Sequence, residues 1–293
     1  MIDLHCHSRC SDGSESPGRV VELASQAGLS ALALTDHDGL DGVDEAGVRA
    51  DALGLELVAG CEVSCRFSPG TMHLLCYFVE PGEGPLQSLL ARLRVDRAER
   101  NERLVARLSS LGVSITMDEV VAEAGGGTIG RPHFAAVLAR KGSVSSYEAA
   151  FETLLAKGGP AYVPKAFVEA PSAIGAARES GAVVSLAHPL SLGLGPDGLE
   201  GVVGELRQVG LEGLESNYGR YQPEERAGLA ALANANGLVS TGGSDFHGSY
   251  KPDLFVGTGT GDLEVADSVL DELRARLGRH TGGRISHSQR PAR

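Results

Sequence analysis

Two histidines stand one residue apart near the start of the chain, in the segment Asp3-Leu4-His5-Cys6-His7. If this segment is a strand, its period of two places both imidazoles on the same face. Imidazole is a common ligand of divalent cations, so a buried pair of this kind is best explained by an ion that both rings contact. Two exposed histidines on an edge strand are the alternative if the motif stands alone.

Further side chains that bind metals recur where apolar, strand-like runs of the sequence end. They are His37, Glu62, His188, Asp245 and His247. In an α/β barrel the carboxyl ends of the strands meet at one mouth, so these side chains would lie close to the first two histidines. Histidines scattered through a core would not repeat at this position. The sequence therefore predicts one metal centre at the mouth of a barrel.

The chain around these residues alternates short apolar strands with amphipathic helices. This alternation predicts an α/β fold of parallel strands covered by helices. Between Pro85 and Pro164 the pattern changes to long helices rich in leucine and arginine, which predicts an all-helical insertion. The predicted parts are a first barrel segment at 1–84, the insertion at 85–164, a second barrel segment at 165–278 and a disordered, polar tail at 279–293.

Composition narrows the classes of function. The chain has 293 residues, with 26 Lys+Arg against 38 Asp+Glu and a formal charge of −12. An acidic surface argues against a protein that coats DNA and against a polybasic membrane binder. The sequence shows no signal peptide and no apolar run of the roughly 20 residues that a membrane helix needs. Five cysteines without framework spacing fit reduced thiols in a cytoplasmic protein, and no protein partner is implied.

The candidate ligands lie within longer motifs that follow one another along the chain. These are His5-x-His7 with Ser11-Asp12-Gly13, Thr35-Asp36-His37-Asp38, Gly60-x-Glu62, His73, Ala187-His188-Pro189 and Gly243-Ser244-Asp245-x-His247. Together they resemble the polymerase and histidinol phosphatase (PHP) family over about residues 1–80 and 165–260. The resemblance implies a distorted (β/α)₇ barrel that holds three divalent metal ions and hydrolyses phosphoesters with a metal-bridging hydroxide as nucleophile.

The resemblance also implies nine ligands, two of which the strand-end argument does not reach. The first ion would take His5, His7, Glu62 and Asp245, the second Glu62, His73 and His188, and the third Asp12, His37 and His247. The resemblance favours Mn²⁺, although Fe²⁺ and Zn²⁺ suit the same donors. Asp36 and His188 are the candidates for assisting proton transfer.

Two motifs in the insertion resemble the branch of the family that acts on 3′,5′-nucleoside bisphosphates. They are Gly130-Arg131-Pro132-His133-Phe134 and Lys157-Gly158-Gly159-Pro160-Ala161-Tyr162-Val163-Pro164. The expected substrate is thus a small nucleotide such as pAp, which would lose its 3′-phosphate to give the 5′-monophosphate. Relatives of this branch trim RNA from its 5′ end, so a 5′-3′ exonuclease on short RNA is the alternative. A metal-binding regulatory module without turnover is the alternative of another class.

The residues expected to bind the second, non-reacting phosphate lie in the first of these motifs. Arg131 would start a helix, where free backbone amides also favour an anion, and we predict that it holds this phosphate with His133 beside it. The alternative is a solvated arginine and a core-facing histidine. Lys165 is a further candidate.

Other candidates for substrate contact have equally ordinary alternatives. Arg97, Arg100 and Arg103 recur every three residues among acidic residues, which predicts mostly salt-bridged side chains on a surface helix. One of them reaching the phosphate is the alternative. The candidates for packing on the base are Tyr218, Tyr221 and Phe246. Filling of the core is the alternative for each.

Overall fold

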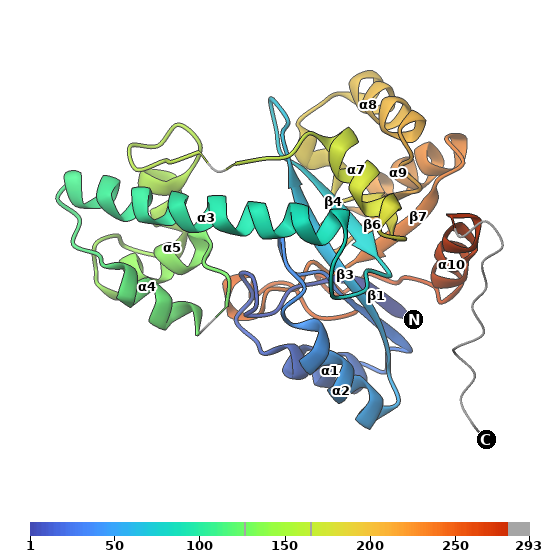
Figure 1. Cartoon of the computed structure of the whole chain (residues 1–293), viewed down its shortest axis with the longest axis horizontal. Helices are drawn as coiled ribbons and strands as arrows, with labels where there is room; N and C mark the ends of the chain where they lie inside the picture. Colours follow the sequence, from blue (N-terminus) through green and yellow to red (C-terminus); the bar gives the residue numbers. More distant parts are fainter. Residues whose placement is uncertain (126, 165, 281–293) are drawn as a thin grey trace.

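The computed structural model describes residues 1–125, 127–164 and 166–280, and the side chains of these residues up to 278. Figure 1 shows strands enclosed by helices, with the long helix α3 leading from them to a separate group of helices. None of the helices within the described residues is long and apolar enough to cross a membrane. The tail predicted at 279–293 lies almost wholly outside the described residues, although α10 continues to His280.

Seven strands form the sheet, in the order in which they occur in the chain. They are β1 (Ile2–Cys6), β2 (Ala31–Leu34), β3 (Glu56–Cys65), β4 (Met72–Tyr77), β5 (Val183–Leu186), β6 (Gly213–Tyr218) and β7 (Val239–Gly243). The sheet nearly closes on itself, because the backbone after β7 pairs with β1. There the Asp245 N–H donates to the carbonyl of His5 at 2.8 Å, and Cys6 and Phe246 form a parallel bridge. The predicted α/β barrel is confirmed.

Strand β4 runs against both of its neighbours. It pairs antiparallel with β3 and β5, while the other neighbouring strands pair parallel. The expectation of parallel strands throughout is therefore wrong here, because a short connection and no helix separates β3 from β4. The reversal brings the start of β4 to the mouth, where its second residue, His73, pairs with Ser64 near the end of β3.

Helices cover the outside of the barrel (Figure 1). They are α1 (Pro17–Gln26), α2 (Val43–Leu53), α7 (Ala170–Glu179), α8 (Pro196–Gln208), α9 (Pro223–Ala235) and α10 (Ser268–His280). Helix α1 shows why their starts could be predicted. The Ser16 side chain accepts a hydrogen bond from the Arg19 N–H, and Pro17 follows in the first turn, where its missing N–H costs nothing.

The insertion begins with helix α3 and has a core of its own. Its elements are α3 (Pro85–Ser110), α4 (Met117–Ala124), α5 (Arg131–Arg140), α6 (Tyr147–Ala150) and a π-helical turn (Phe151–Leu155). The first part of α3 packs into the barrel core through Leu90 and Leu93, whereas Leu104 and Leu108 belong to the core of the insertion. The middle of α3 consequently lies where the two cores adjoin.

Candidate metal centre

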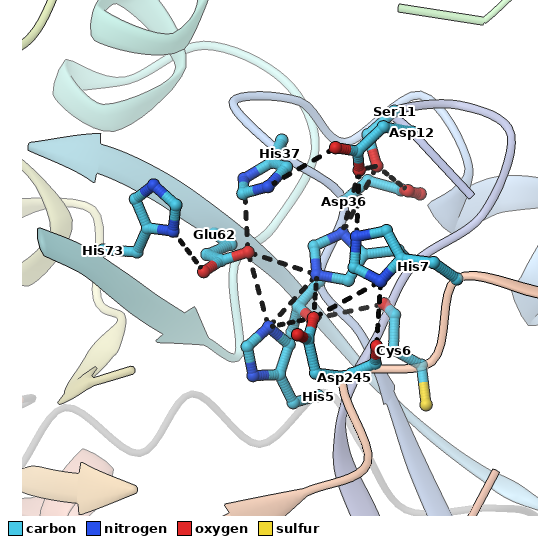
Figure 2. A network of polar contacts seen from close by, with 12 residues as sticks. His5, Cys6, His7, Ser11, Asp12, Asp36, His37, Glu62, His73 and Asp245 are labelled. Carbon is cyan, nitrogen blue, oxygen red and sulfur yellow. Dashed lines mark hydrogen bonds and ion pairs between the residues drawn. The ribbon is translucent and has the colours of Figure 1, made fainter. Parts of the chain in front are cut away.

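The nine predicted ligands converge at the mouth of the barrel, and Figure 2 shows most of them facing one another. Eight of them fall into three groups whose ligand atoms lie within 4.8 Å of one another. The groups are His7, Asp12, His37 and His247; His5, His7 and Asp245; and His37, Glu62 and His73. The ninth, His188, has its Nε2 2.9 Å from Glu62 Oε1. Each group contains most of the residues of one predicted ligand set. Which residues bind which ion stays a prediction.

The two histidines of the first motif share one face, as the strand period predicted. Both are fully buried, with His5 Nε2 and His7 Nε2 3.1 Å apart. Glu62 Oε2 lies 3.1 Å from His7 Nε2 and 3.4 Å from His5 Nε2. His37 Nδ1 is buried without a hydrogen-bond partner, although Glu62 Oε2 is 3.2 Å away. Nitrogen and carboxylate atoms that face one point in this way fit a shared cation.

The charges of the cluster suit the same interpretation. Burial alone would raise the pKa of Glu62, but His37, His73 and His5 hold it well below its usual range. Burial lowers the pKa of His37 to about 3, so this imidazole is neutral. For His7, burial lowers the pKa, yet hydrogen bonds with Asp245 and Glu62 raise it to about 9. A divalent ion would displace that proton, as metal binding to histidine generally does.

The backbone is held in an unusual conformation at the same place. Three of the four non-glycine residues with positive φ among the described residues are Asp38 (53°), His188 (27°) and Asp245 (55°). Such conformations cost about 1–3 kcal/mol each and gather at functional sites, where the surrounding contacts enforce them. Two of these three residues, His188 and Asp245, are predicted ligands.

A cavity of about 200 Å³ opens beside the cluster. The barrel contributes Asp12, His37 and His73 to its wall, and the insertion contributes the cations Arg97, Arg100, Arg131 and Lys157. Predicted metal ligands and positively charged side chains thus line the same cavity.

Comparison with known proteins agrees with this geometry. The family model described as PHP domain matches residues 3–154. The chain belongs to the PHP family. Its relatives include a 3′,5′-nucleoside bisphosphate phosphatase of Chromobacterium violaceum, 31% identical over 278 residues, which are 94% of this chain and 97% of that protein. A 5′-3′ exoribonuclease of Haemophilus influenzae is 31% identical over 268 residues, 92% of this chain and 96% of that protein.

A solved structure confirms the fold of the PHP protein. A candidate metal-dependent phosphoesterase of Bifidobacterium adolescentis superposes with a TM-score of 0.83 at 33% identity, covering 94% of this chain and 96% of that one. The family predicted from the motifs is therefore confirmed over almost the whole chain, including the helical insertion.

Two arginines of α3 correct the expectation of a salt-bridged surface helix. Only 7% of Arg97 and 2% of Arg100 is exposed, because this part of α3 is enclosed between the two cores. An Arg97 Nη2–H donates to the Asp38 carboxylate, whereas Nε and Nη1 of Arg100 are buried without a hydrogen-bond partner. Burial and repulsion from Arg97 and Arg131 lower the pKa of Arg100 to about 9. Arg103, one turn further, is exposed as expected.

The predicted phosphate-binding motif is placed only in part as expected. Arg131 is the first residue of α5 and lines the cavity, with one Nη1–H donating to the carbonyl of Leu155 at 3.1 Å. His133 is buried, and its Nδ1 accepts the Gly130 N–H at 3.0 Å. The core-facing alternative therefore describes His133, and the Gly130 N–H beside this helix start is not free for an anion. Lys165 lies outside the described residues.

The predicted base-packing residues have other partners. The Tyr218 hydroxyl donates to Asp245 Oδ2 at 2.7 Å, and the Tyr221 hydroxyl accepts the Leu190 N–H at 2.9 Å. Phe246 belongs to the barrel core. None of the three is among the residues that line the cavity.

Asp36, a candidate for proton transfer, anchors the loop that follows β1. It accepts hydrogen bonds from the Ser8 N–H at 2.8 Å, from the Ser8 hydroxyl at 2.6 Å and from the Ser11 hydroxyl at 2.6 Å. Burial raises its pKa despite these donors. The other candidate, His188, has its Nδ1 2.9 Å from the hydroxyl of Ser191. Both proton-transfer roles stay predictions.

Two buried carboxylates behind the ligands were missed by sequence reasoning. Asp3 accepts the backbone N–H groups of Ser244 and Gly257, which ties β1 to the loop that carries Asp245. Glu215 contacts His5 Nδ1 at 2.8 Å. For Glu215 the available signal was the one that identified Glu62, namely an acidic residue that closes an apolar strand-like run. Asp3 stands at the start of β1, so it carries no such signal.

Proposed function

We propose that this PHP protein is a metal-dependent phosphatase that removes the 3′-phosphate from nucleoside 3′,5′-bisphosphates such as pAp. The observation that carries the proposal is the cavity lined both by predicted metal ligands and by Arg100, whose Nε and Nη1 are buried without a hydrogen-bond partner. A bisphosphate presents two anions at a fixed separation, so it can use both walls at once. The bisphosphate phosphatase of Chromobacterium violaceum, which aligns over nearly its full length, supports the same substrate.

The nine ligands would hold three divalent cations, with Mn²⁺ favoured by the family resemblance. Such ions, when bound, supply Lewis acidity at phosphoryl oxygens and an acidified water. The chain itself contributes the arrangement of the donors. Glu62 lies at the centre because His5, His7, His37, His73 and His188 all contact its two oxygens.

The second phosphate would be held by the insertion. Arg100 and Arg131 line the cavity, and a charge-assisted hydrogen bond from either to the phosphate would contribute about 1.5–3 kcal/mol. Lys157 adds a further positive charge. Phe67, Tyr162 and Phe167 line the same cavity and offer apolar surface to the nucleoside. A local concentration of cations overcomes the net charge of −12 only over a short range, which favours a small substrate.

The test is phosphate release from pAp by protein loaded with Mn²⁺, with the variant Arg131→Ala beside it. We expect release by the wild-type protein, a reduced rate for Arg131→Ala and an unchanged rate for Arg103→Ala, a matched change of an exposed arginine. Release from pAp no faster than that of His7→Ala would contradict the proposal.

A second candidate is 5′-3′ exonuclease activity on short RNA, favoured by the exoribonuclease of Haemophilus influenzae among the relatives. The same cation wall could hold a 5′-phosphate while a phosphodiester lies at the metal centre. Rates on pAp and on a 5′-phosphorylated oligonucleotide at equal concentration decide between the two. If metal raises the melting temperature while both substrates stay intact, the protein is a non-catalytic metal-binding module.

We also propose a cytoplasmic location. All five cysteines are free thiols, and four of them are buried in the barrel. Reduced, unpaired cysteines are typical of proteins in a reducing compartment. Mass spectrometry of thiols alkylated in intact cells tests this proposal, since a disulfide in most of the protein would contradict it.

A further inference from the structure

Glu215 lies in β6 directly behind the metal centre. None of its surface is exposed, and it belongs to none of the three ligand groups. Its Oε1 lies 2.8 Å from His5 Nδ1, while its Oε2 accepts the backbone N–H of His188 at 2.6 Å. One carboxylate thus contacts two predicted ligands, one from β1 and one from the segment after β5.

The contact with His5 determines which nitrogen of that ring faces the centre. A carboxylate accepts hydrogen bonds, so Nδ1 carries a proton, and in the neutral ring that binds a metal the lone pair is on Nε2. Nε2 is the atom that faces His7 Nε2 at 3.1 Å and Glu62 Oε2 at 3.4 Å. A charged acceptor behind a ligating imidazole also makes that imidazole a stronger donor to a metal.

The contact with His188 fixes a strained backbone. His188 has a φ of 27°, which a residue with a side chain adopts only where its surroundings enforce it. The hydrogen bond from its N–H to Glu215 is short, and beyond it the ring reaches Glu62 Oε1 with Nε2 at 2.9 Å. Glu215 is therefore placed to hold both the ring of His5 and the backbone of His188.

Other ligands receive weaker support. The Nδ1 atom of His188 meets the hydroxyl of Ser191, and that of His247 meets the backbone carbonyl of Asp245 at 2.8 Å. These neutral groups orient a ring without adding charge. The Glu215 carboxylate differs from these groups because it is an acidic side chain and because it contacts two predicted ligands.

We propose that Glu215 is a positioning residue of the metal centre, which sets the tautomer of His5 and the placement of His188 without itself binding a metal. The inference rests on the proposed metal centre and not on the identity of the substrate. Removal of such a supporting carboxylate weakens metal affinity by about 10- to 100-fold in known metal sites.

Glutamine is an informative replacement because it has nearly the same shape. In Glu215→Gln one of the two oxygen positions becomes an NH2 group, which donates and does not accept, so only one of the His5 Nδ1–H and the His188 N–H would still meet an oxygen in its present place. Glu215→Asp retains the charge and both oxygens on a shorter stem, and we expect an affinity between those of Gln and the wild type. Glu205→Gln, an exposed position on α8, is the matched control for the loss of one charge.

The experiment is equilibrium dialysis of metal-free protein against Mn²⁺, read by elemental analysis, together with melting temperatures with and without Mn²⁺. We expect Glu215→Gln to bind Mn²⁺ about 10- to 100-fold more weakly and to gain less melting temperature from Mn²⁺ than the wild type, while Glu205→Gln matches the wild type. Wild-type affinity in Glu215→Gln would overturn the inference. So would a lower melting temperature of the metal-free variant with an unchanged gain from Mn²⁺, since that pattern shows a purely structural role.

No nucleotide is present in this experiment, which separates it from the proposed function. A wild-type protein that binds Mn²⁺ but leaves pAp intact would contradict the phosphatase proposal alone. The dependence of Mn²⁺ affinity on Glu215 would still decide the inference.

Discussion

The two walls of the cavity satisfy their polar groups in opposite ways. On the barrel side, carboxylates and imidazoles contact one another, and Glu62 alone is in contact with five histidines. On the insertion side, Arg100 is buried with two guanidinium nitrogens unpaired, and neighbouring arginines repel it. Under the proposed function, the barrel wall would hold cations and the insertion wall would hold an anion.

This difference indicates a division of tasks. The barrel carries the groups that any phosphoester hydrolysis at this centre would need. The insertion carries cationic side chains that line the cavity, and under the proposed function these would contact a second phosphate and set the choice of substrate. The following predictions test that division, from the largest expected effect to the smallest.

Loss of the barrel centre should remove activity. We expect His7→Ala to lower the rate on pAp by at least about 1,000-fold, because several kcal/mol of transition-state stabilisation depend on bound metal. Dialysis against a chelator should have the same effect on the wild type, and added Mn²⁺ should restore the wild type but not His7→Ala. The measurement is phosphate release, with circular dichroism to show that the variant is folded. Substantial activity in the chelated wild type would contradict the barrel's part in the division.

Loss of the insertion's buried cation should change selectivity instead. We expect Arg100→Met to lower kcat/KM for pAp by about 10- to 100-fold, which corresponds to one or two charge-assisted hydrogen bonds. For 3′-AMP, which lacks the second phosphate, the same variant should change kcat/KM by less than about threefold. Arg103→Met is the matched control on the exposed face of α3. Equal losses on both substrates would place Arg100 in the reaction itself.

Tyr218 should behave as part of the barrel wall. Its hydroxyl shares Asp245 Oδ2 with the ammonium of Lys251, so Tyr218→Phe should lower kcat by only about fivefold, or ~1 kcal/mol. The ratio of rates on pAp and pCp should stay constant in this variant. A changed ratio would show that Tyr218 packs on the base, as the sequence suggested.

The buried Arg100 nitrogens without a hydrogen-bond partner should also lower the stability of the protein in the absence of ligand. Replacing Arg100 by Met should raise stability without ligand by about 1 kcal/mol, which is roughly 2–4 °C in melting temperature for a chain of this size. Inorganic phosphate should raise the melting temperature of the wild type more than that of the variant. Calorimetry in a phosphate-free buffer checks both statements. A lower melting temperature for Arg100→Met would mean that the arginine supports the junction of the two cores.

The convergence of side chains at the barrel mouth could be predicted from the sequence because every predicted ligand except Asp12 and His73 is tied to a local pattern. The spacing of His5 and His7 and the position of Glu62 late in a strand-like run are visible without a structure. Asp12 and His73 came only from the family resemblance. The position of strand ends could not predict His73, because this residue lies at the start of β4. Since β4 runs antiparallel to its neighbours, the start of this strand, and not its end, lies at the mouth.

The insertion wall could not be predicted in the same way. A sequence with arginines three residues apart among acidic residues is the same whether the helix is exposed or enclosed between two cores. Arg97 and Arg100 are buried because α3 is long enough to join both cores, as Leu93 and Leu104 show. The charge pattern of α3 shows how its side chains are spaced along the helix, but not which other elements pack against it.

The sequence by itself determined the family and the predicted donors of the metal centre with their order along the chain, because residue chemistry and strand period are local properties. Tertiary structure decided which groups stand behind those donors and which cations face them. Glu215 and His5 are 210 residues apart in the chain, yet their side chains are 2.8 Å apart. Such contacts depend on how the strands close into a barrel and on how α3 packs across its mouth, and no local pattern encodes either distance.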